Sequence, residues 1–144
     1  MKYKFFYTLF AVSFLFSCSH EKQNVITGKI EGLQVGDRIF LSVEDTEGSL
    51  WVPTDSTVVT KAEEFTLKTK ETGCYVRLTY LKSGEIFKPE NAQVPRCFLE
   101  TYANLNITGN TENWYYIKTT GGLYSHPDMQ EINHLTDSAK LIQK

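Results

Sequence analysis

The chain has 144 residues, of which 41% are hydrophobic and 22% are charged, with a formal net charge of −2 at pH 7. This length suits one domain with a single core and leaves little room for two. No basic stripe is present to hold a row of phosphates, which argues against a nucleic acid as the partner.

The first 17 residues have the layout of a bacterial lipoprotein signal peptide. Lys2 and Lys4 precede an apolar run over Phe5–Phe16, and the small Ser17 stands directly before Cys18. The export machinery and signal peptidase read these features: a basic start, a short apolar run and a small residue before the cut. The run is too short to span a bilayer, which needs about 20 apolar residues. We therefore expect cleavage between Ser17 and Cys18.

Cleavage would make Cys18 the first residue, with a diacylglycerol on its thiol and a third acyl chain, such as palmitate, on its amine. At roughly 0.8 kcal/mol per buried CH₂, several chains give lasting attachment where one would not. The alternative is an ordinary secretory signal over residues 1–17 with an incidental Cys18. Phe16 favours that alternative, since it is bulkier than the residue usual at its position.

Residues 18–24 are expected to form the lipidated cysteine and a polar tether. Loss of Lys2 and Lys4 leaves 13 basic residues against 17 acidic ones, a mildly acidic balance of −4. Ser19, rather than an acid, follows Cys18, so no inner-membrane retention signal of the enterobacterial type is present. We expect an anchor in the outer membrane that faces the periplasm.

From residue 25 to residue 122 the sequence predicts β-structure. Apolar and polar residues alternate with the period of two typical of half-buried strands, and Gly, Pro, Asp and Asn divide the runs. Pro53 is expected to end one run. Spacings of about 8–12 residues indicate an antiparallel β-sandwich or open barrel of about eight short strands. The runs are Ile26–Ile30, Ile39–Val43, Leu50–Val52, Thr57–Val59, Phe65–Thr69, Cys74–Tyr80, Cys97–Leu99, Leu105–Ile107 and Trp114–Lys118.

The C-terminal segment, residues 123–144, has a different pattern. Ser125 is placed to cap a helix with Pro127 in its first turn. The apolar residues that follow step by three and four, which predicts one amphipathic helix over residues 126–143. Its apolar stripe consists of Met129, Ile132, Leu135, Ala139 and Ile142.

Cys74 and Cys97 are the cysteines left for the folded domain, in a compartment that permits disulfides. Both lie in segments expected to form a hairpin around the polar stretch 82–95. A loop centred near the middle of that stretch would place Cys97 opposite residues 79–80 and Cys74 opposite residues 102–103. This register favours two small buried thiols over a bridge. The chain contains no Cys-x-x-Cys, so it carries no thioredoxin-type redox centre of its own.

Short strand and turn motifs follow one another in a distinctive order from residue 25 to residue 122. They are Ile26-Thr27-Gly28-Lys29-Ile30-Glu31-Gly32-Leu33, Asp37-Arg38-Ile39-Phe40-Leu41, Asp55-Ser56 with Val58, Glu64-Phe65-Thr66-Leu67, Phe98-Leu99-Glu100, Leu105-Asn106-Ile107-Thr108-Gly109 and Ile117-Lys118-Thr119-Thr120-Gly121-Gly122. Behind a lipidated cysteine, this order resembles the uncharacterised β-rich domain found N-terminal to thioredoxin-like domains of the TlpA, ResA or AhpC kind in Bacteroidetes-type envelope lipoproteins. The resemblance implies a β-sandwich-like fold and an envelope setting. It implies no reaction, because the family's redox activity belongs to the domain that follows.

The chain departs from this family by stopping at Lys144, where the family continues through a linker-like helix into the thioredoxin-like domain. Two interpretations are open: a stand-alone relative, or a longer protein that has been cut short. The apolar stripe of the predicted helix suits both.

Catalytic and metal-ligating patterns are weak. His126 and His134 are eight residues apart and share a helix face, but two histidines do not make a metal site. Asp55 and Ser56 are better explained as the start of a strand than as a base and a nucleophile. We expect a non-enzymatic protein with no catalytic residue, no metal and no cofactor.

The aromatic residues are the candidate binding surface. Trp51 lies beside a turn, and Trp114, Tyr115 and Tyr116 are consecutive, so in a strand at least one of these three must face outward. Aromatic faces near loops stack on sugar rings or dock proteins. The alternative is that they cover an edge of a small sandwich.

Three functional interpretations result. The first is a lipid-anchored, non-catalytic interaction or positioning module whose partner is an envelope protein or a thioredoxin-like domain. The second is a glycan-binding outer-membrane lipoprotein that uses Trp51, Trp114 and Tyr116 as stacking platforms. The third is a truncated thiol–disulfide reductase or peroxidase without its catalytic domain.

Overall fold

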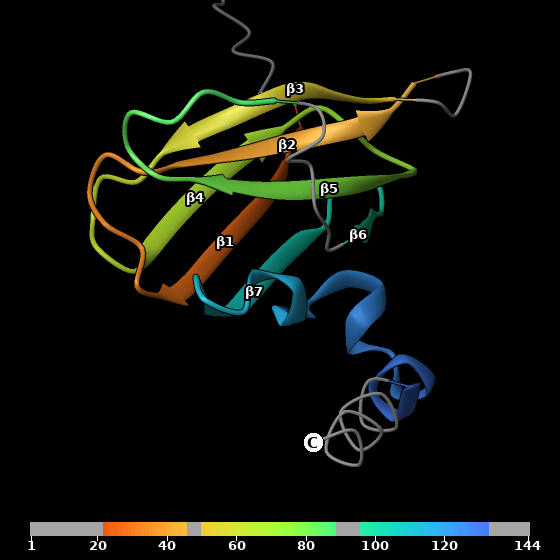
Figure 1. The fold of residues 1–144 in the computed structure, drawn as a ribbon. Helices are drawn as coiled ribbons and strands as arrows, with labels where there is room; N and C mark the ends of the chain where they lie inside the picture. The colour runs from red at the N-terminus through yellow and green to blue at the C-terminus, as the bar shows by residue number, and fades with distance from the viewer. Residues whose placement is uncertain (1–21, 46–49, 89–95, 133–144) are drawn as a thin grey trace, which may run out of the picture.

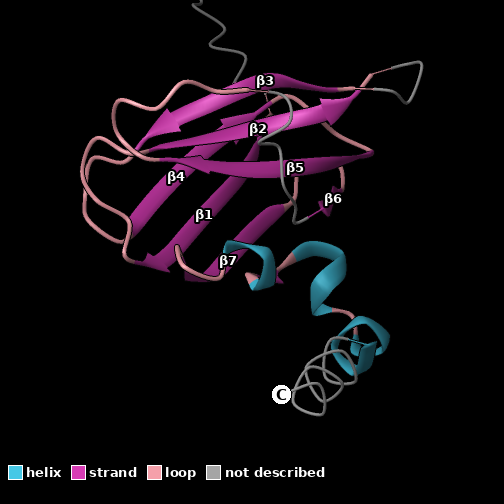
Figure 2. Ribbon diagram, viewed as in Figure 1, coloured by secondary structure: helices cyan, strands magenta, loops and turns pink. Residues whose placement is uncertain are grey.

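The structure is a computed structural model that describes residues 22–45, 50–88 and 96–132. Within these ranges eight strands form two four-stranded sheets that pack face to face, with no closed barrel (Figure 1). Strands dominate, and helical turns appear only towards the C-terminal end of the described chain (Figure 2). The predicted β-sandwich is therefore confirmed. Cys18, the signal segment and most of the predicted C-terminal helix lie outside the described residues.

Sheet A has the strand order β4-β1-β7-β8, and sheet B has the order β3-β2-β5-β6. The strands of sheet A are β1 (Asn24–Glu31), β4 (Glu64–Thr69), β7 (Asn104–Asn110) and β8 (Lys118–Thr120). The strands of sheet B are β2 (Arg38–Glu44), β3 (Trp51–Val58), β5 (Cys74–Leu81) and β6 (Arg96–Leu99). Sheet B crosses over sheet A in the view of Figure 1.

The alternation predicted from the sequence selects the inner faces of the sheets. On β1, for example, Ile26 and Ile30 are fully buried, while the intervening Lys29 is exposed. Side chains from both sheets meet between the layers and form one core, as expected for aligned apolar faces. Its central members are Ile26, Ile30, Ile39, Leu41, Leu67, Val76, Leu78, Leu99, Leu105 and Ile107.

One pairing corrects the expectation of a purely antiparallel sandwich. β1 and β7 run parallel, with Val25 opposite Asn104 and Glu31 opposite Asn110. The chain leaves sheet A after β4, builds β5 and β6 in sheet B, and returns through a tight turn at residues 100–103. It therefore enters β7 from the same end as β1, and a parallel neighbour results.

Two predicted strand boundaries were wrong. Pro53 does not end a strand but lies inside β3, opposite Ser42, next to an irregularity in the ladder. β3 is an edge strand of sheet B, where the missing proline N–H costs no ladder bond. Trp114–Tyr116 is not a strand but a 3₁₀ turn, η2, and the last strand of the sheet starts at Lys118.

The predicted register around the cysteines was also wrong. Cys97 lies opposite Val76, and Cys74 lies opposite Leu99. The connection is therefore centred nearer to Phe87 than to the middle of residues 82–95. Phe87 packs on Phe40 with ring centroids 5.1 Å apart, which holds the first half of the connection on sheet B. Both cysteines are free thiols, with Cys97 buried and Cys74 half-buried.

A second 3₁₀ turn, η3 (Gly122–Ser125), precedes a helical segment at residues 127–132. Ser125 is the last residue of η3 and is not the predicted cap. Instead the carbonyl of His126 accepts the N–H of Gln130 at 3.1 Å, which places the helix start one residue later. The rest of the predicted helix, with His134, lies outside the described residues.

The two ends of the sandwich differ in their connections. The end beside Asn24, here called the proximal end, holds the turns 70–73 and 100–103 and the β2–β3 hairpin. Buried Asn24 joins two of these, since its amide donates to Glu71 O and accepts from Ala103 N, both at 2.6 Å. The opposite, distal end holds the connections 32–37, 59–63, 82–88 and 111–117.

Candidate functional site

Trp114 is part of the structure rather than an open platform. Its indole N–H donates to the carbonyl of Leu78 at 2.8 Å, and its ring packs on Tyr80 at a centroid distance of 5.5 Å. The ladder between β5 and β6 ends at Arg77 and Arg96, so the indole satisfies the next carbonyl along β5. Trp114 thus fastens the η2 turn to the inner side of sheet B, which is the edge-covering role considered from the sequence.

Replacement of Trp114 by phenylalanine should lower the free energy of unfolding by about 1–2 kcal/mol, because Leu78 O loses its donor. Urea denaturation followed by circular dichroism measures the change. Tyr115→Phe is the matched control, since Tyr115 is exposed on the same turn. Removal of its hydroxyl should lower the free energy of unfolding by less than about 0.5 kcal/mol. Equal stability of the two variants would contradict the fastening role of Trp114.

Trp51 lies on the outer face of sheet B with two arginines against its ring. The Arg77 guanidinium carbon is 4.0 Å from the ring centroid and that of Arg96 is 5.2 Å away. Burial lowers the pKa of Arg77, and the neighbouring positive charge of Arg96 adds to this, while Glu44 opposes it. Cation–π contact with Trp51 offsets part of the repulsion between the two guanidinium groups. The ring face of Trp51 is therefore already in use.

Tyr115 and Tyr116 are the exposed members of the predicted surface, with 61% and 52% of their area accessible. Their rings contact each other edge to face at 5.1 Å. They lie on η2, which follows β7 at the bottom of the sandwich in Figure 1, whereas Trp51 begins β3 at the top. The structure therefore does not bring the four predicted aromatics together into one surface.

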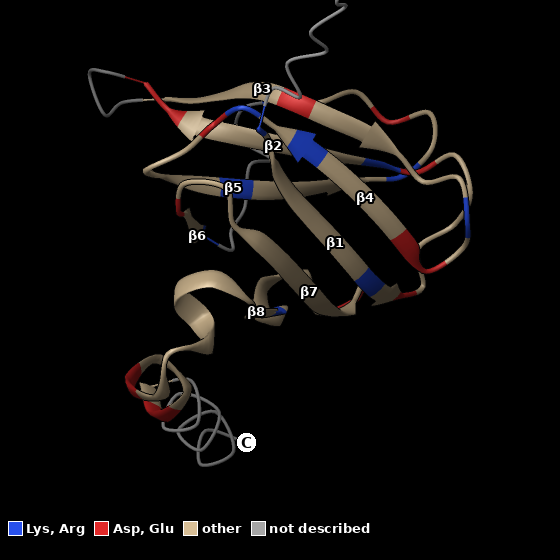
Figure 3. Ribbon diagram, turned by 180° about the vertical axis from the view of Figure 1, so that it is seen from behind, with Lys and Arg blue, Asp and Glu red and all other residues tan. Residues whose placement is uncertain are grey.

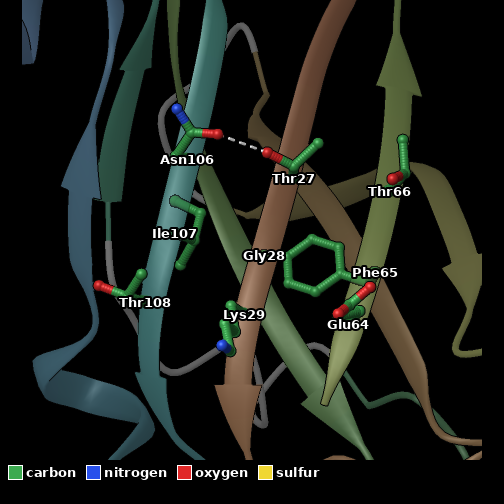
Figure 4. Close-up of a pocket in the computed structure, with 9 residues that line it drawn as sticks. All are labelled: Thr27, Gly28, Lys29, Glu64, Phe65, Thr66, Asn106, Ile107 and Thr108. Carbon is green, nitrogen blue, oxygen red and sulfur yellow. Dashed lines mark hydrogen bonds between the residues drawn. The ribbon is translucent and has the colours of Figure 1, made fainter. Parts of the chain in front are cut away.

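The outer face of sheet A carries a shallow hollow of about 390 Å³ between β1, β4 and β7 (Figure 4). The Thr27 hydroxyl donates to the Asn106 amide oxygen at 2.6 Å and fixes that side chain at the rim. A second hollow of about 400 Å³ shares Lys29 and Thr108 with the first. Hydroxyl, amide, amine and carboxylate groups line this face, so it suits hydrogen bonding to a polar partner. The first hollow is lined by Thr27, Gly28, Lys29, Glu64, Phe65, Thr66, Asn106, Ile107 and Thr108.

Charge is spread over this face rather than concentrated. Acidic and basic residues are interspersed on the strands of sheet A (Figure 3). Glu64 begins β4 and Lys68 lies near its end, while Lys29 and Glu31 follow each other on the exposed side of β1. This mixed pattern gives no single-sign field of the kind that steers a nucleic acid or another highly charged partner.

Two residues of the weak catalytic and metal patterns make side-chain contacts in the structure. Asp55 accepts a short hydrogen bond from the Thr69 hydroxyl, which joins β3 to β4 at a corner of the sandwich. His126 Nδ1 lies 3.5 Å from the carboxylate of Asp128 in an exposed pair. Among the residues that the structure describes, no three His, Cys, Asp or Glu side chains gather as metal ligands would. In the same ranges no helix has the length and apolar character needed to cross a membrane.

Cys97 in the core and the half-buried Tyr80 packed against it are weakened acids. Burial raises the pKa of Cys97 to about 12, with a further rise from Cys74 beside it. Burial also raises the pKa of Tyr80 to about 12, and the carboxylates of Asp37 and Glu85 add to the effect. A thiol with such a pKa is almost entirely protonated at neutral pH, so Cys97 is a poor nucleophile.

These shifts predict a loss of stability in alkali. The unfolded chain ionises its thiols and phenols near pH 9–10, while the folded protein keeps Cys97 and Tyr80 protonated until about pH 12. The stabilisation that comes from keeping these two groups protonated is thus complete below about pH 9 and disappears as the pH rises towards 12. The urea midpoint should fall between about pH 8 and 11, less steeply in Cys97→Ala. A constant midpoint would contradict the assigned shifts.

Two aromatic residues near strand ends were not foreseen from the sequence. The Tyr124 hydroxyl on η3 accepts the backbone N–H of Phe98 at 2.8 Å and so covers edge strand β6. Tyr102, in the turn before β7, has a left-handed φ of 58° and is 56% exposed. Neither residue has a local sequence signal, since the partner of Tyr124 lies 26 positions earlier and the ring of Tyr102 contacts Lys22, which precedes β1.

No protein-family model matches this chain, and no curated protein or solved structure matches it either.

Proposed function

We propose that the chain is a lipid-anchored, non-catalytic interaction domain of the bacterial cell envelope, held on the periplasmic side of the outer membrane. The observation that carries the proposal is the sequence of residues 1–18, with its basic start, short apolar run and Ser17-Cys18 junction. The sandwich is consistent with such a role, because its described residues form a packed core and hydrogen-bonding faces, and its aromatic residues include exposed ones.

The contact surface belongs to the distal end in this proposal. Tyr115 and Tyr116 are exposed there, and Val35 and Ile86 are 62% and 79% accessible on neighbouring connections. Exposed aromatic and aliphatic side chains are the groups that anchor protein interfaces. An envelope protein is the proposed partner. The resemblance to domains that precede thioredoxin-like domains makes a thioredoxin-like protein the first to test.

The anchor is tested by metabolic labelling with palmitate in cells that make the wild-type protein or Cys18→Ser. Wild type should be labelled and found with the membranes, whereas Cys18→Ser should be unlabelled and lose membrane attachment, because a hydroxyl does not form the thioether. Cys74→Ser is the matched control and should label like wild type. Equal labelling of wild type and Cys18→Ser, or none in either, would refute the proposal.

A further inference from the structure

We propose that the proximal end of the sandwich contacts the bilayer surface, with Tyr102 and Lys22 at the headgroups and with Leu50 and Val52 facing the bilayer from the start of β3, at the other edge of sheet B. This inference rests on the lipid anchor proposed above and goes further, since it fixes which end of the domain faces the membrane. The distal end, with Tyr115 and Tyr116, then points towards the periplasm.

Only a short stretch of free chain joins the proposed anchor to the folded domain. Lys22 is already held on the domain, since its ammonium group lies 5.0 Å from the centre of the Tyr102 ring. Four peptide steps separate Cys18 from Lys22, which span at most about 14 Å. The eight residues of β1 span roughly 26 Å, more than this reach. The anchor therefore keeps the proximal end near the headgroups, while the distal end can lie well away from them.

Tyr102 combines an unusual backbone conformation with an exposed ring. Its φ of 58° is a left-handed conformation that bulky residues rarely adopt, and glycine would adopt it without strain. The turn nevertheless presents a tyrosine whose ring is 56% exposed. A strained and exposed aromatic residue suggests a contact made outside the domain. Tyrosine with a neighbouring lysine is the combination enriched at membrane interfaces, where the ring lies among the headgroups.

The β2–β3 hairpin adds aliphatic area at the same end. Leu50 is 58% exposed and Val52 is 45% exposed. Val52 lies opposite Val43, which in turn lies opposite Val76 near the start of β5, so Val52 lies towards the proximal end of sheet B. Each such side chain contributes about 1–2 kcal/mol when it leaves water, which is useful only because the anchor already holds the domain in place.

The charges of this end decide what kind of lipid surface it suits. Four basic residues at this end are matched in number by four acidic ones, so no net positive charge results: Lys22, Lys70, Arg77 and Arg96 against Glu44, Asp45, Glu71 and Glu100. Attraction to anionic lipid is therefore not the driving force. The contact depends on the aromatic and aliphatic side chains, and a zwitterionic bilayer should serve as well as an anionic one.

Hydroxyl-radical footprinting read by mass spectrometry tests the inference without any substitution. The lipoprotein purified from cells is placed in phosphatidylcholine vesicles, with and without phosphatidylglycerol, and compared with a soluble chain of residues 19–144. Tyr102 and Tyr115 are internal references for each other, since they are similarly exposed, at 56% and 61%, and lie at opposite ends. Modification of Tyr102 should fall about fivefold in both kinds of vesicle, while Tyr115 changes little.

Three results would overturn the inference. Equal protection of Tyr102 and Tyr115 would mean no preferred orientation, and unchanged Tyr102 would mean no contact. Protection of Tyr102 in the soluble chain that grows with concentration would identify a second copy as the occupant. Failure of the anchor is separable, because a chain that starts at Cys18 and carries Cys74→Ser can be coupled through Cys18 to a maleimide lipid and the same footprint taken.

Discussion

Gly28→Ala should destabilise the folded protein by about 3 kcal/mol, the upper part of the range for overpacked cores. An added Cβ would lie 1.9 Å from the Cε1 atom of Phe65, whose ring lies across Gly28 on the neighbouring strand (Figure 4). Phe65 is only 5% exposed and packs among core side chains, so the ring has little room to move. Urea denaturation gives the change in the free energy of unfolding.

A second substitution separates this clash from a general effect of alanine. Phe65→Leu shortens the side chain, so Gly28→Ala introduced into that background should cost less than half of what it costs in the wild type. The double variant also gives a measurement if Gly28→Ala alone does not fold. Additive effects of the two substitutions would show that the Phe65 ring is not what excludes a side chain at position 28.

Asp37→Ala should lower the free energy of unfolding by about 3 kcal/mol, because a buried carboxylate that accepts two backbone N–H groups is removed. Asp37 is 3% exposed; one oxygen accepts from Gln34 N at 2.9 Å and the other from Ser83 N at 3.0 Å. It thereby ties the turn before β2 to the connection after β5. Without it, both donors are left without their acceptor at the distal end.

Two controls make the role of Asp37 specific. Asp37→Asn keeps one acceptor oxygen and should lose about half as much stability as Asp37→Ala. The negative charge of Asp37 also raises the pKa of Tyr80, so in Asp37→Asn that phenol should ionise below its wild-type value of about 12. Ultraviolet titration of the tyrosines measures the pKa of this phenol. Wild-type stability of Asp37→Ala would contradict the assigned hydrogen bonds.

The sequence predicts the layers of this fold because the period-two pattern is local. Ile26 and Ile30, or Leu105 and Ile107, show which side of a strand is buried without knowledge of its neighbours. Pairing is not local. The parallel contact of β1 with β7 joins residues about 80 positions apart, and the register of Cys97 with Val76 depends on Phe87 packing on Phe40. Neither is encoded in a short window of sequence.

The candidate surface was predicted only in part for the same reason. Aromatic side chains stood out in the sequence, but their partners did not. Trp114 is bound to Leu78, 36 residues earlier, and Trp51 is bound to arginines of two other strands. Tyr115 and Tyr116 were left exposed. The sequence does not indicate the left-handed turn at Tyr102, because residues in this conformation are usually glycine or asparagine.

The mass of the N-terminal peptide of the protein purified from membranes tests the anchor most directly. If Cys18 is processed as proposed, that peptide begins at Cys18 and carries the added mass of a diacylglyceryl group together with an amide-linked acyl chain. A mature chain that begins at any other residue, or that begins at Cys18 with an unmodified thiol, would contradict the lipid anchor and the membrane-facing orientation that depends on it.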